Sequence, residues 1–275
     1  YGFSVRPVNM IVEVRNITLN KTSLTLQPDN TVTLIATVLP SNAMDKTVTW
    51  TSSNTSVATV DNSGVVTALS DGAADITAQA GSKTATCTVN VISETGIIIN
   101  GVTWATRNVD APGTFAASPE SFGMLYQWNR NVGWSAENPL KNSDGGDDWD
   151  SSTPSGVAWI AANDPSPAGW HIPTQEELKT LLDKDNVTSE WTTLNRIPGR
   201  RFTDKNTGTS IFLPAVGLRD GYGTGALENA GSAGYYWSNE QSGSSRGYCM
   251  TFENNSVNMY ASWRYYGFSV RPVKE

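Results

Sequence analysis

Histidine and cysteine, two residue types that often act in catalysis, are scarce in this sequence. His171 is the only histidine, so a Ser-His-Asp constellation cannot be assembled. Its position just before Pro173 and Thr174 predicts a structural role at the entrance to a helix. The two cysteines, Cys87 and Cys249, fall in different predicted domains, and we expect buried free thiols instead of a disulfide or a nucleophile. We therefore predict a protein that is not an enzyme and that uses no cofactor.

Carboxylates gather at one place along the chain, and clustered carboxylates suit Ca²⁺. The candidate ligands are Asp144, Asp147, Asp148 and Asp150. Their spacing does not follow an EF-hand, so a solvated loop is the alternative, and we expect no metal. The glycine-rich run at 221–225 lacks the lysine of a phosphate-binding loop and predicts a flexible surface loop.

The stretch between Ser238 and Arg264 is dense in Asn, Ser, Tyr and Trp. Aromatic residues supply contact area at low entropic cost, and Ser and Asn supply adaptable hydrogen bonds, as in antibody loops. This composition favours a ligand-binding surface, with an ordinary polar surface as the alternative. The candidate binding residues are Asn239, Gln241, Ser244, Ser245, Arg246, Tyr248, Glu253, Asn254, Asn258, Tyr260, Ala261, Ser262 and Trp263.

The composition narrows the choice of partners. The chain carries 19 basic and 26 acidic residues, a net charge of −7, and no basic run at either end, so we expect no nucleic-acid partner. No apolar stretch is long enough to insert into a membrane. The chain begins with Tyr and shows no signal peptide, so we expect a processed or trimmed form. Low charge with abundant Thr and Asn is typical of an exported β-rich protein.

Residues 13–93 alternate apolar and polar side chains in short runs separated by turn residues, which predicts a β-sandwich. The runs at 48–54, 57–61, 64–68 and 72–78 resemble the bacterial Ig-like domains of group 2 in their order and spacing. That resemblance implies a spacer or stalk of a surface or phage tail protein. Trp50 is the expected core anchor.

A second domain is predicted at residues 95–275. It opens with a hairpin at 97–109, whose turn is Asn100-Gly101. Thr174 to Glu177 form a capping box for a helix that continues through Leu178, Leu181 and Leu182. A second short helix is expected at 187–194. Later strands are expected at 211–215, 234–238, 246–252 and 267–273.

Five motifs of this domain resemble the "Fibrobacter succinogenes major paralogous" domain. They are Tyr126-Gln127-Trp128, residues 169–174, residues 213–217, residues 234–238 and residues 268–273. The resemblance implies an α+β C-type lectin-like fold, in which the two ends of the domain pair in one sheet. Sulfatase-modifying enzymes share that fold and use cysteines, but here a single cysteine, Cys249, lies in the domain, so we expect no such activity.

The tail from Tyr235 to Val273 also resembles the variable proteins of diversity-generating retroelements. In that family, template adenines are miscopied into the end of the gene, and the scrambled codons alter a binding face. The resemblance therefore implies a diversified ligand-binding face within residues 239–263.

Residues 1–8 repeat residues 266–273 without change. We expect residues 1–12 to contain a strand that duplicates the C-terminus. It is either the end of a preceding tandem module, a strand for exchange with a neighbouring molecule, or a product of gene fusion.

Together these features predict two domains, an all-β Ig-like sandwich followed by an α+β C-type lectin-like domain. We expect an extracellular protein, on a cell surface or a phage virion, that binds a protein or glycan ligand through diversified residues. The alternative is a structural module of a cell-surface or pilus-like assembly without diversification.

Overall fold

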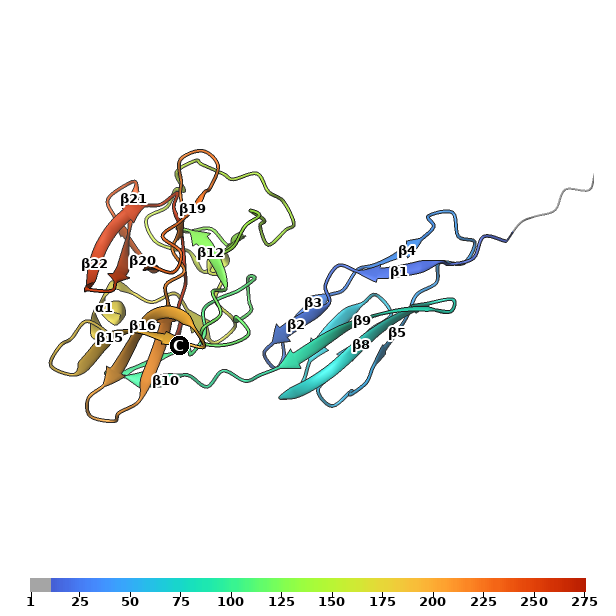
Figure 1. Ribbon diagram of the computed structural model, residues 1–275, viewed down its shortest axis with the longest axis horizontal. Coiled ribbons are helices and arrows are strands. Elements are labelled where there is room, and N and C mark those ends of the chain that lie inside the picture. The colour runs from blue at the N-terminus through green and yellow to red at the C-terminus, as the bar shows by residue number, and fades with distance from the viewer. Residues whose placement is uncertain (1–10) are drawn as a thin grey trace, which may run out of the picture. The chain divides into compact units, whose positions relative to one another are not determined.

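The computed structural model describes residues 11–275, which divide into two compact units with the boundary in the chain between Ser93 and Glu94 (Figure 1). Residues 1–8 lie outside the described residues, and so does the predicted N-terminal strand except for Ile11 and Val12, which are not in a strand. Across the described range, none of the helices has the length and apolar character needed to span a membrane.

The first unit consists of nine strands, as its alternating pattern predicts. They are β1 (Asn16–Leu19), β2 (Ser23–Leu26), β3 (Thr31–Thr33), β4 (Ala36–Leu39), β5 (Thr49–Ser52), β6 (Ala58–Val60), β7 (Val65–Ala68), β8 (Gly72–Ala80) and β9 (Lys83–Val91). The strands form sheets of order β1-β4, β2-β9-β8-β5 and β3-β7-β6. Ile76, Cys87 and Val89 are fully buried between them.

Trp50 packs against the core of the first unit, as predicted. Its ring lies over Gly64, where an added Cβ would come within 2.9 Å of the indole and 2.4 Å of the Leu34 carbonyl oxygen. Gly64 also has a φ of +81°, so both the space and the backbone favour glycine there.

The second unit is nearly all β in the described residues. Its helical elements are a 3₁₀ turn, η1 (Ala161–Asn163), and a six-residue helix, α1 (Gln175–Thr180). Its strands are β10 (Ile97–Ile99), β11 (Val102–Trp104), β12 (Met124–Gln127), β13 (Gly133–Ser135), β14 (Trp170–His171), β15 (Val187–Leu194), β16 (Ile197–Asp204), β17 (Ser210–Pro214), β18 (Leu218–Arg219), β19 (Leu227–Glu228), β20 (Ala233–Ser242), β21 (Arg246–Glu253), β22 (Ser256–Trp263), β23 (Gly267–Phe268) and β24 (Val273–Lys274).

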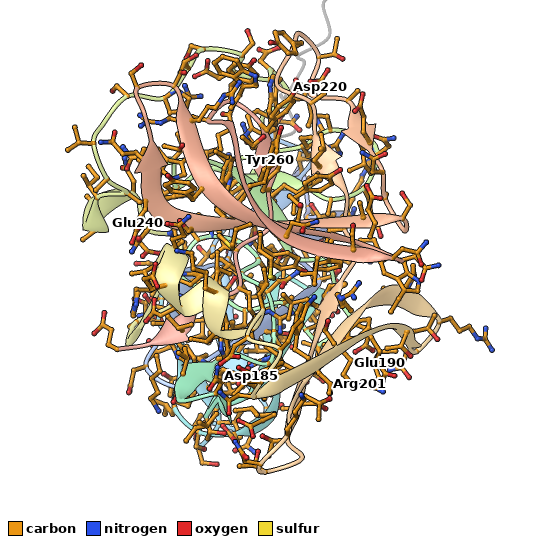
Figure 2. All side chains as sticks on the ribbon, turned by 90° about the vertical axis from the view of Figure 1, so that its left-hand side faces the viewer. Asp185, Glu190, Arg201, Asp220, Glu240 and Tyr260 are labelled. Atoms are coloured by element: carbon orange, nitrogen blue, oxygen red, sulfur yellow. The ribbon has the colours of Figure 1, made fainter. Side chains whose placement is uncertain are left out.

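The predicted helix at 187–194 is wrong, because this segment is strand β15. It pairs along its whole length with β16, from Val187 opposite Asp204 to Leu194 opposite Ile197. Its β-branched residues Val187, Thr188, Thr192 and Thr193 favour a strand over a helix. Glu190 and Arg201, labelled in Figure 2, form an ion pair across this hairpin at 3.0 Å. With one short helix among the described residues, the unit has much less helix than the predicted α+β class implies.

Two local predictions in this unit are confirmed. The Asn100-Gly101 turn joins β10 to β11 with φ angles of +47° and +82°, the left-handed conformations that such a hairpin turn requires. Thr174 caps α1, and its hydroxyl accepts from the Glu177 backbone N–H while the Glu177 carboxylate accepts from the Thr174 N–H.

Residues 266–273 lie at the centre of the second unit. Phe268 pairs with Tyr126 on β12, and Val273 pairs with both Trp104 on β11 and His171 on β14. The first hairpin of the unit and its last strand therefore share one sheet, of order β10-β11-β24-β14.

The Arg271 side chain is completely buried in this segment. Its Nε donates to the Asn108 Oδ1 at 2.9 Å and its Nη1 donates to the Ala105 carbonyl at 3.2 Å. Burial lowers the pKa of Arg271 to about 10, which still leaves the guanidinium charged at neutral pH. The hydrogen bonds to oxygens near the start of the unit offset part of the cost of burying that charge.

A buried ion pair also ties the start of the second unit to its interior. Arg107 Nε lies 3.0 Å from Glu94 Oε2, and both side chains are at most 5% exposed. Burial raises the pKa of Glu94, but hydrogen bonds from Thr106 and Arg107 outweigh it and hold this pKa below the ordinary value of 4.5.

We predict that Glu94→Gln lowers the free energy of unfolding of the second unit by about 3 kcal/mol, because it removes the buried carboxylate that faces Arg107. Urea unfolding followed by tryptophan fluorescence reports on this unit, which contains nine of the ten tryptophans. The control is Glu176→Gln, which breaks the solvent-exposed pair with Lys179 and is expected to cost less than about 1 kcal/mol.

The Arg107–Glu94 pair should also make the free energy of unfolding depend on pH. A carboxyl whose pKa is lowered by folding stabilises the fold fully above its unfolded pKa, about 4.3, and loses that contribution as the pH falls through the lower folded value. The difference between wild type and Glu94→Gln should therefore narrow below pH 4. If the difference in unfolding free energy between wild type and Glu94→Gln did not change with pH, the lowered pKa of Glu94 would be contradicted.

Candidate ligand-binding face

The predicted binding residues lie on the three-stranded sheet β20-β21-β22 and its two turns. All thirteen are exposed or half-buried. On β21 they alternate with buried residues, because Gly247, Cys249, Met250 and Phe252 face the interior. The sheet therefore holds the candidates at the surface on a backbone that is fixed from within.

Strand register divides the candidates between the two faces of this sheet. Arg246 lies opposite Trp263, and Tyr248 lies opposite Ala261. Side chains directly opposite each other in an antiparallel pair share a face, and their neighbours along the strand take the other face. These four residues form one group, called here the Trp263 face. Asn258, Tyr260 and Ser262 alternate with them on β22 and form the Tyr260 face.

Both faces of the sheet pack against a core, but at different ends. Met250 and Phe252 contact the cluster that contains Phe202, Leu213 and Tyr236. Cys249, on the opposite face, joins the cluster around Trp128 and Trp237. Each face is therefore covered along one part of the sheet and open along the other, so the two groups of candidates are exposed on different sides.

The two turns of the sheet are far apart. Ser244 and Ser245 lie in the β20–β21 turn, and Glu253 and Asn254 lie at the β21–β22 turn. The eight residues of β21 span roughly 26 Å at about 3.3 Å per residue. The structure thus does not bring all the predicted residues into one patch.

An aromatic group continues the Trp263 face. Arg246 lies over the Trp263 ring at 4.5 Å, and Trp263 stacks on Tyr265 at 5.8 Å with nearly parallel planes. Tyr222 packs edge-on against Tyr265 at 5.1 Å and is itself 65% exposed. Tyr222 and Tyr265 are absent from the residues predicted from the sequence, because they lie outside the Asn- and Ser-rich stretch.

The loop that carries Tyr222 lies at the surface, as the sequence predicted, with residues 222–224 exposed, but at Gly221 it packs closely on this group. A Cβ added at Gly221 would come within 1.8 Å of the Tyr265 ring. The run of glycines around Tyr222 was the available clue, since a glycine can mark a close approach between chain segments.

Buried Arg264 fixes the β20–β21 turn. Its Nη2 donates to the Gln241 Oε1 at 3.0 Å and to the Gly243 carbonyl at 2.9 Å, and its guanidinium lies 4.1 Å from the Trp128 ring centre. Gln241 is thereby engaged inside the protein. Asn239 lies where the β20–β21 register shifts, and its backbone N–H donates to the Pro173 carbonyl.

On the opposite side of the sheet, Tyr260 is 62% exposed (Figure 2). Its backbone carbonyl lies 3.7 Å from the Cys249 sulfur. Burial raises the pKa of the Cys249 thiol, which disfavours the thiolate. Cys87 is likewise a buried free thiol, so the predicted free cysteines are confirmed.

The other candidate residues have structural contacts. His171 Nε2 lies 3.6 Å from the Glu177 carboxylate at the start of α1. Asp147 pairs with Lys141 at 2.7 Å, which lowers the Asp147 pKa, and Asp150 pairs with Arg130. Within residues 11–275, no three His, Cys, Asp or Glu side chains are close enough together to hold a metal ion.

Comparison with known proteins identifies the first unit. Residues 13–89 match the model of the bacterial Ig-like domain (group 2), so this part of the chain is such a domain. An uncharacterized protein of Clostridium acetobutylicum is 47% identical over 78 residues, which cover 27% of this chain and 8% of that protein. The kappa-carrageenase of Pseudoalteromonas carrageenovora is 41% identical over 75 residues, covering 27% and 19%.

The Ig-like virion protein of Serratia phage KSP90 is 39% identical over 84 residues, which cover 30% of this chain and 33% of the phage protein. The matched stretches thus cover a third or less of these three relatives. Among solved structures, domains 5–6 of the S-layer protein SbsC align over 94% of this chain and 96% of theirs, at 14% identity and a TM-score of 0.27.

We predict that Gly221→Ala displaces the Tyr265 ring and lowers the free energy of unfolding by about 1–3 kcal/mol, as overpacking usually does. The near-ultraviolet circular dichroism of the stacked Trp263 and Tyr265 should change with it. Gly223→Ala is the control in the same loop, since its Cβ meets nothing within 4 Å and only the strain of its positive φ remains. A Gly221→Ala spectrum identical to that of wild type would show that the loop does not seat Tyr265.

Proposed function

We propose that the protein is a ligand-binding adhesin of a bacterial cell surface or phage virion, in which the Ig-like domain presents a C-type lectin-like domain. The location is supported by the Ig-like domain and by its likeness to the virion protein of phage KSP90. The ligand is a protein or a glycan on another surface, and neither nucleic acid nor membrane insertion is involved. The net charge of −7 supports the exclusion of nucleic acid.

Two features support a lectin-like second domain. Its first hairpin and its last strand share one sheet, as the resemblance to the "Fibrobacter succinogenes major paralogous" domain implies. Its motif residues Trp128, Trp237 and Phe268 meet in one buried cluster. The small helix content is the feature that fits this fold least.

The observation that carries the binding function is the Trp263 face with its neighbouring aromatic group. Trp263, Tyr248 and Tyr222 offer ring surface to solvent, and Arg246, Ser244 and Ser245 offer polar groups beside them. Arg264 and Tyr265 hold the backbone and rings from beneath. Rigid aromatic anchors surrounded by adaptable polar side chains are the usual composition of a protein recognition surface.

The alternative is a structural module of a cell-surface or pilus-like assembly without diversification. The comparisons support this alternative more directly, since the family match and the phage virion protein concern Ig-like modules. The proposal of a diversified face is supported only by the residues of the second unit.

The gene distinguishes these two functions. Diversification requires a near-copy of the 3′ end of the coding sequence that differs from it only at adenines, next to a reverse-transcriptase gene. We expect sequencing of the locus to find both, with the differences falling in codons of the Trp263 face and of the turn at Ser244 and Ser245. A locus without either element would leave the structural module as the function.

We also propose that the protein is not an enzyme. Cys249 is fully buried and its thiol pKa is raised, so it is a poor nucleophile. Rapid labelling of Cys249 by a maleimide in the native protein would contradict this.

We predict that Trp263→Ala and Tyr222→Ala each weaken ligand binding about 30-fold, the effect of losing a contact worth about 2 kcal/mol. The full chain is screened on a glycan array and a panel of bacterial surface proteins, and the variants are measured by surface plasmon resonance on the ligand found. Asn258→Ala and Tyr260→Ala, on the opposite face, are the controls and should change the Kd less than twofold. If the Tyr260-face variants lose binding while the Trp263-face variants keep it, the site lies on the other side of the sheet.

A further inference from the structure

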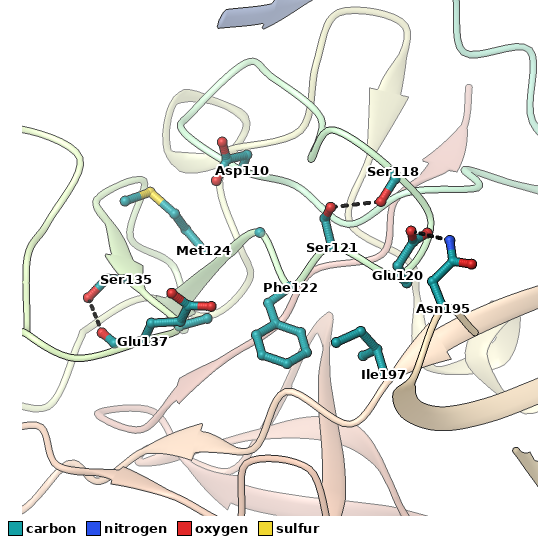
Figure 3. Close-up of a pocket in the computed structure, with 12 residues that line it drawn as sticks. Asp110, Ser118, Glu120, Ser121, Phe122, Met124, Ser135, Glu137, Asn195 and Ile197 are labelled. Carbon is teal, nitrogen blue, oxygen red and sulfur yellow. Dashed lines mark hydrogen bonds between the residues drawn. The ribbon is translucent and has the colours of Figure 1, made fainter. Parts of the chain in front are cut away.

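A pocket of about 560 Å³ opens in the second unit, apart from the β20-β21-β22 sheet (Figure 3). It is formed by residues 118–124, the segment that follows β13, and the turn between β15 and β16. Phe122, Met124 and Ile197 supply its apolar wall, and Asp110, Glu120 and Glu137 supply carboxylates. The binding function proposed above makes no use of these residues.

The charge of the pocket is one-sided. Of the described residues that line it, three are acidic and none is Lys, Arg or His. The Asn195 amide donates to Glu120 Oε1 at 2.6 Å, which lowers the pKa of Glu120 and keeps it ionised at neutral pH. The Glu137 side chain is exposed, and in the described part of the chain its carboxylate makes no ion pair.

The apolar wall would accommodate the stem of a charged group. Phe122, Met124 and Ile197 are all half-buried, so each keeps some surface open to solvent. Phe122 packs on the cluster of Leu125, Ala136 and Val216, which supports the ring from behind. The open surface of an aromatic ring attracts a planar cation.

The wall that carries Glu137 is fixed by a buried cation that does not neutralise the pocket. Arg219 is 1% exposed and donates to the carbonyl oxygens of Ser135 and Glu137 at 3.0 and 2.6 Å. Its remaining hydrogen bonds go to Ser135 Oγ, Asn138 and Gly225. The guanidinium is thus engaged by neutral groups behind the wall.

We propose that this pocket binds an arginine side chain presented by a partner protein. The guanidinium is planar, pairs with carboxylates through two donors at once and stacks on aromatic rings. Glu120 and Glu137 provide the carboxylates, Phe122 the ring, and Met124 and Ile197 the surface for the three methylene groups. The net charge of −7 favours the approach of a basic partner segment.

The test uses the full chain with ¹³C-methyl-labelled methionine. Met124 lines the pocket and reports on it, whereas Met44 lies in the first unit and serves as the internal control. The probe is the peptide acetyl-Gly-Gly-Arg-Gly-Gly-amide, and the matched peptide carries citrulline, the neutral isostere of arginine. We expect the Met124 resonance to shift saturably with the arginine peptide and at least tenfold more weakly with citrulline, while Met44 stays unchanged.

Variants test the assignment of the carboxylates. Glu120→Gln combined with Glu137→Gln should weaken the arginine response at least tenfold, and unchanged Met250 and Met259 resonances would show that the core is intact. Glu253→Gln, which removes an exposed carboxylate at the β21–β22 turn, should leave the response as in wild type. Equal responses to arginine and citrulline, or no response at Met124, would overturn the proposal. Neither result bears on the Trp263 face.

Discussion

The second unit depends on the burial of one irregular segment, residues 266–273. Seven of its eight residues, all except Tyr266, are buried, and the segment pairs with strands from the beginning and the middle of the unit. Arg271 is its most constrained member: its Nη2 is buried without a hydrogen-bond partner among the described residues, and its Nε and Nη1 need oxygens to offset the cost of burying the charge. Asn108 and the Ala105 carbonyl provide them. The same eight-residue sequence also stands in front of the Ig-like domain, as residues 1–8.

The β20-β21-β22 sheet shows how a buried framework can carry a changeable surface. Its two faces contact two different cores, through Phe252 on one side and Cys249 on the other. Substitutions at open positions such as Tyr248 or Ser244 therefore leave these contacts in place. The cost of this arrangement is that the open parts of the two faces point in different directions, so one ligand does not reach all of them.

Several elements were predictable because short-range chemistry determines them. The Asn100-Gly101 turn, the capping box of α1 and the strands of the Ig-like domain each depend on residues close together in the chain. The segment 187–194 was wrongly predicted as a helix, because its short apolar pattern fits a helix or a strand and only pairing with β16 decides between them. The grouping of Tyr222 with Trp263 and Tyr265 was also beyond reach, since about forty residues separate them.

The sequence by itself determined the two-part organisation, the Ig-like character of the first part and the exposure of the Asn-, Ser- and Tyr-rich stretch. Alternation along a strand and composition are local properties, and they suffice for these conclusions. Only the tertiary structure decided which of the exposed residues share a face. Strand register depends on the pairing partners, and a shift of one residue moves every side chain of the strand to the opposite face of the sheet. The acidic pocket around Phe122 also forms only in the tertiary structure, because folding, and not spacing in the chain, brings Glu120, Glu137 and Ile197 together.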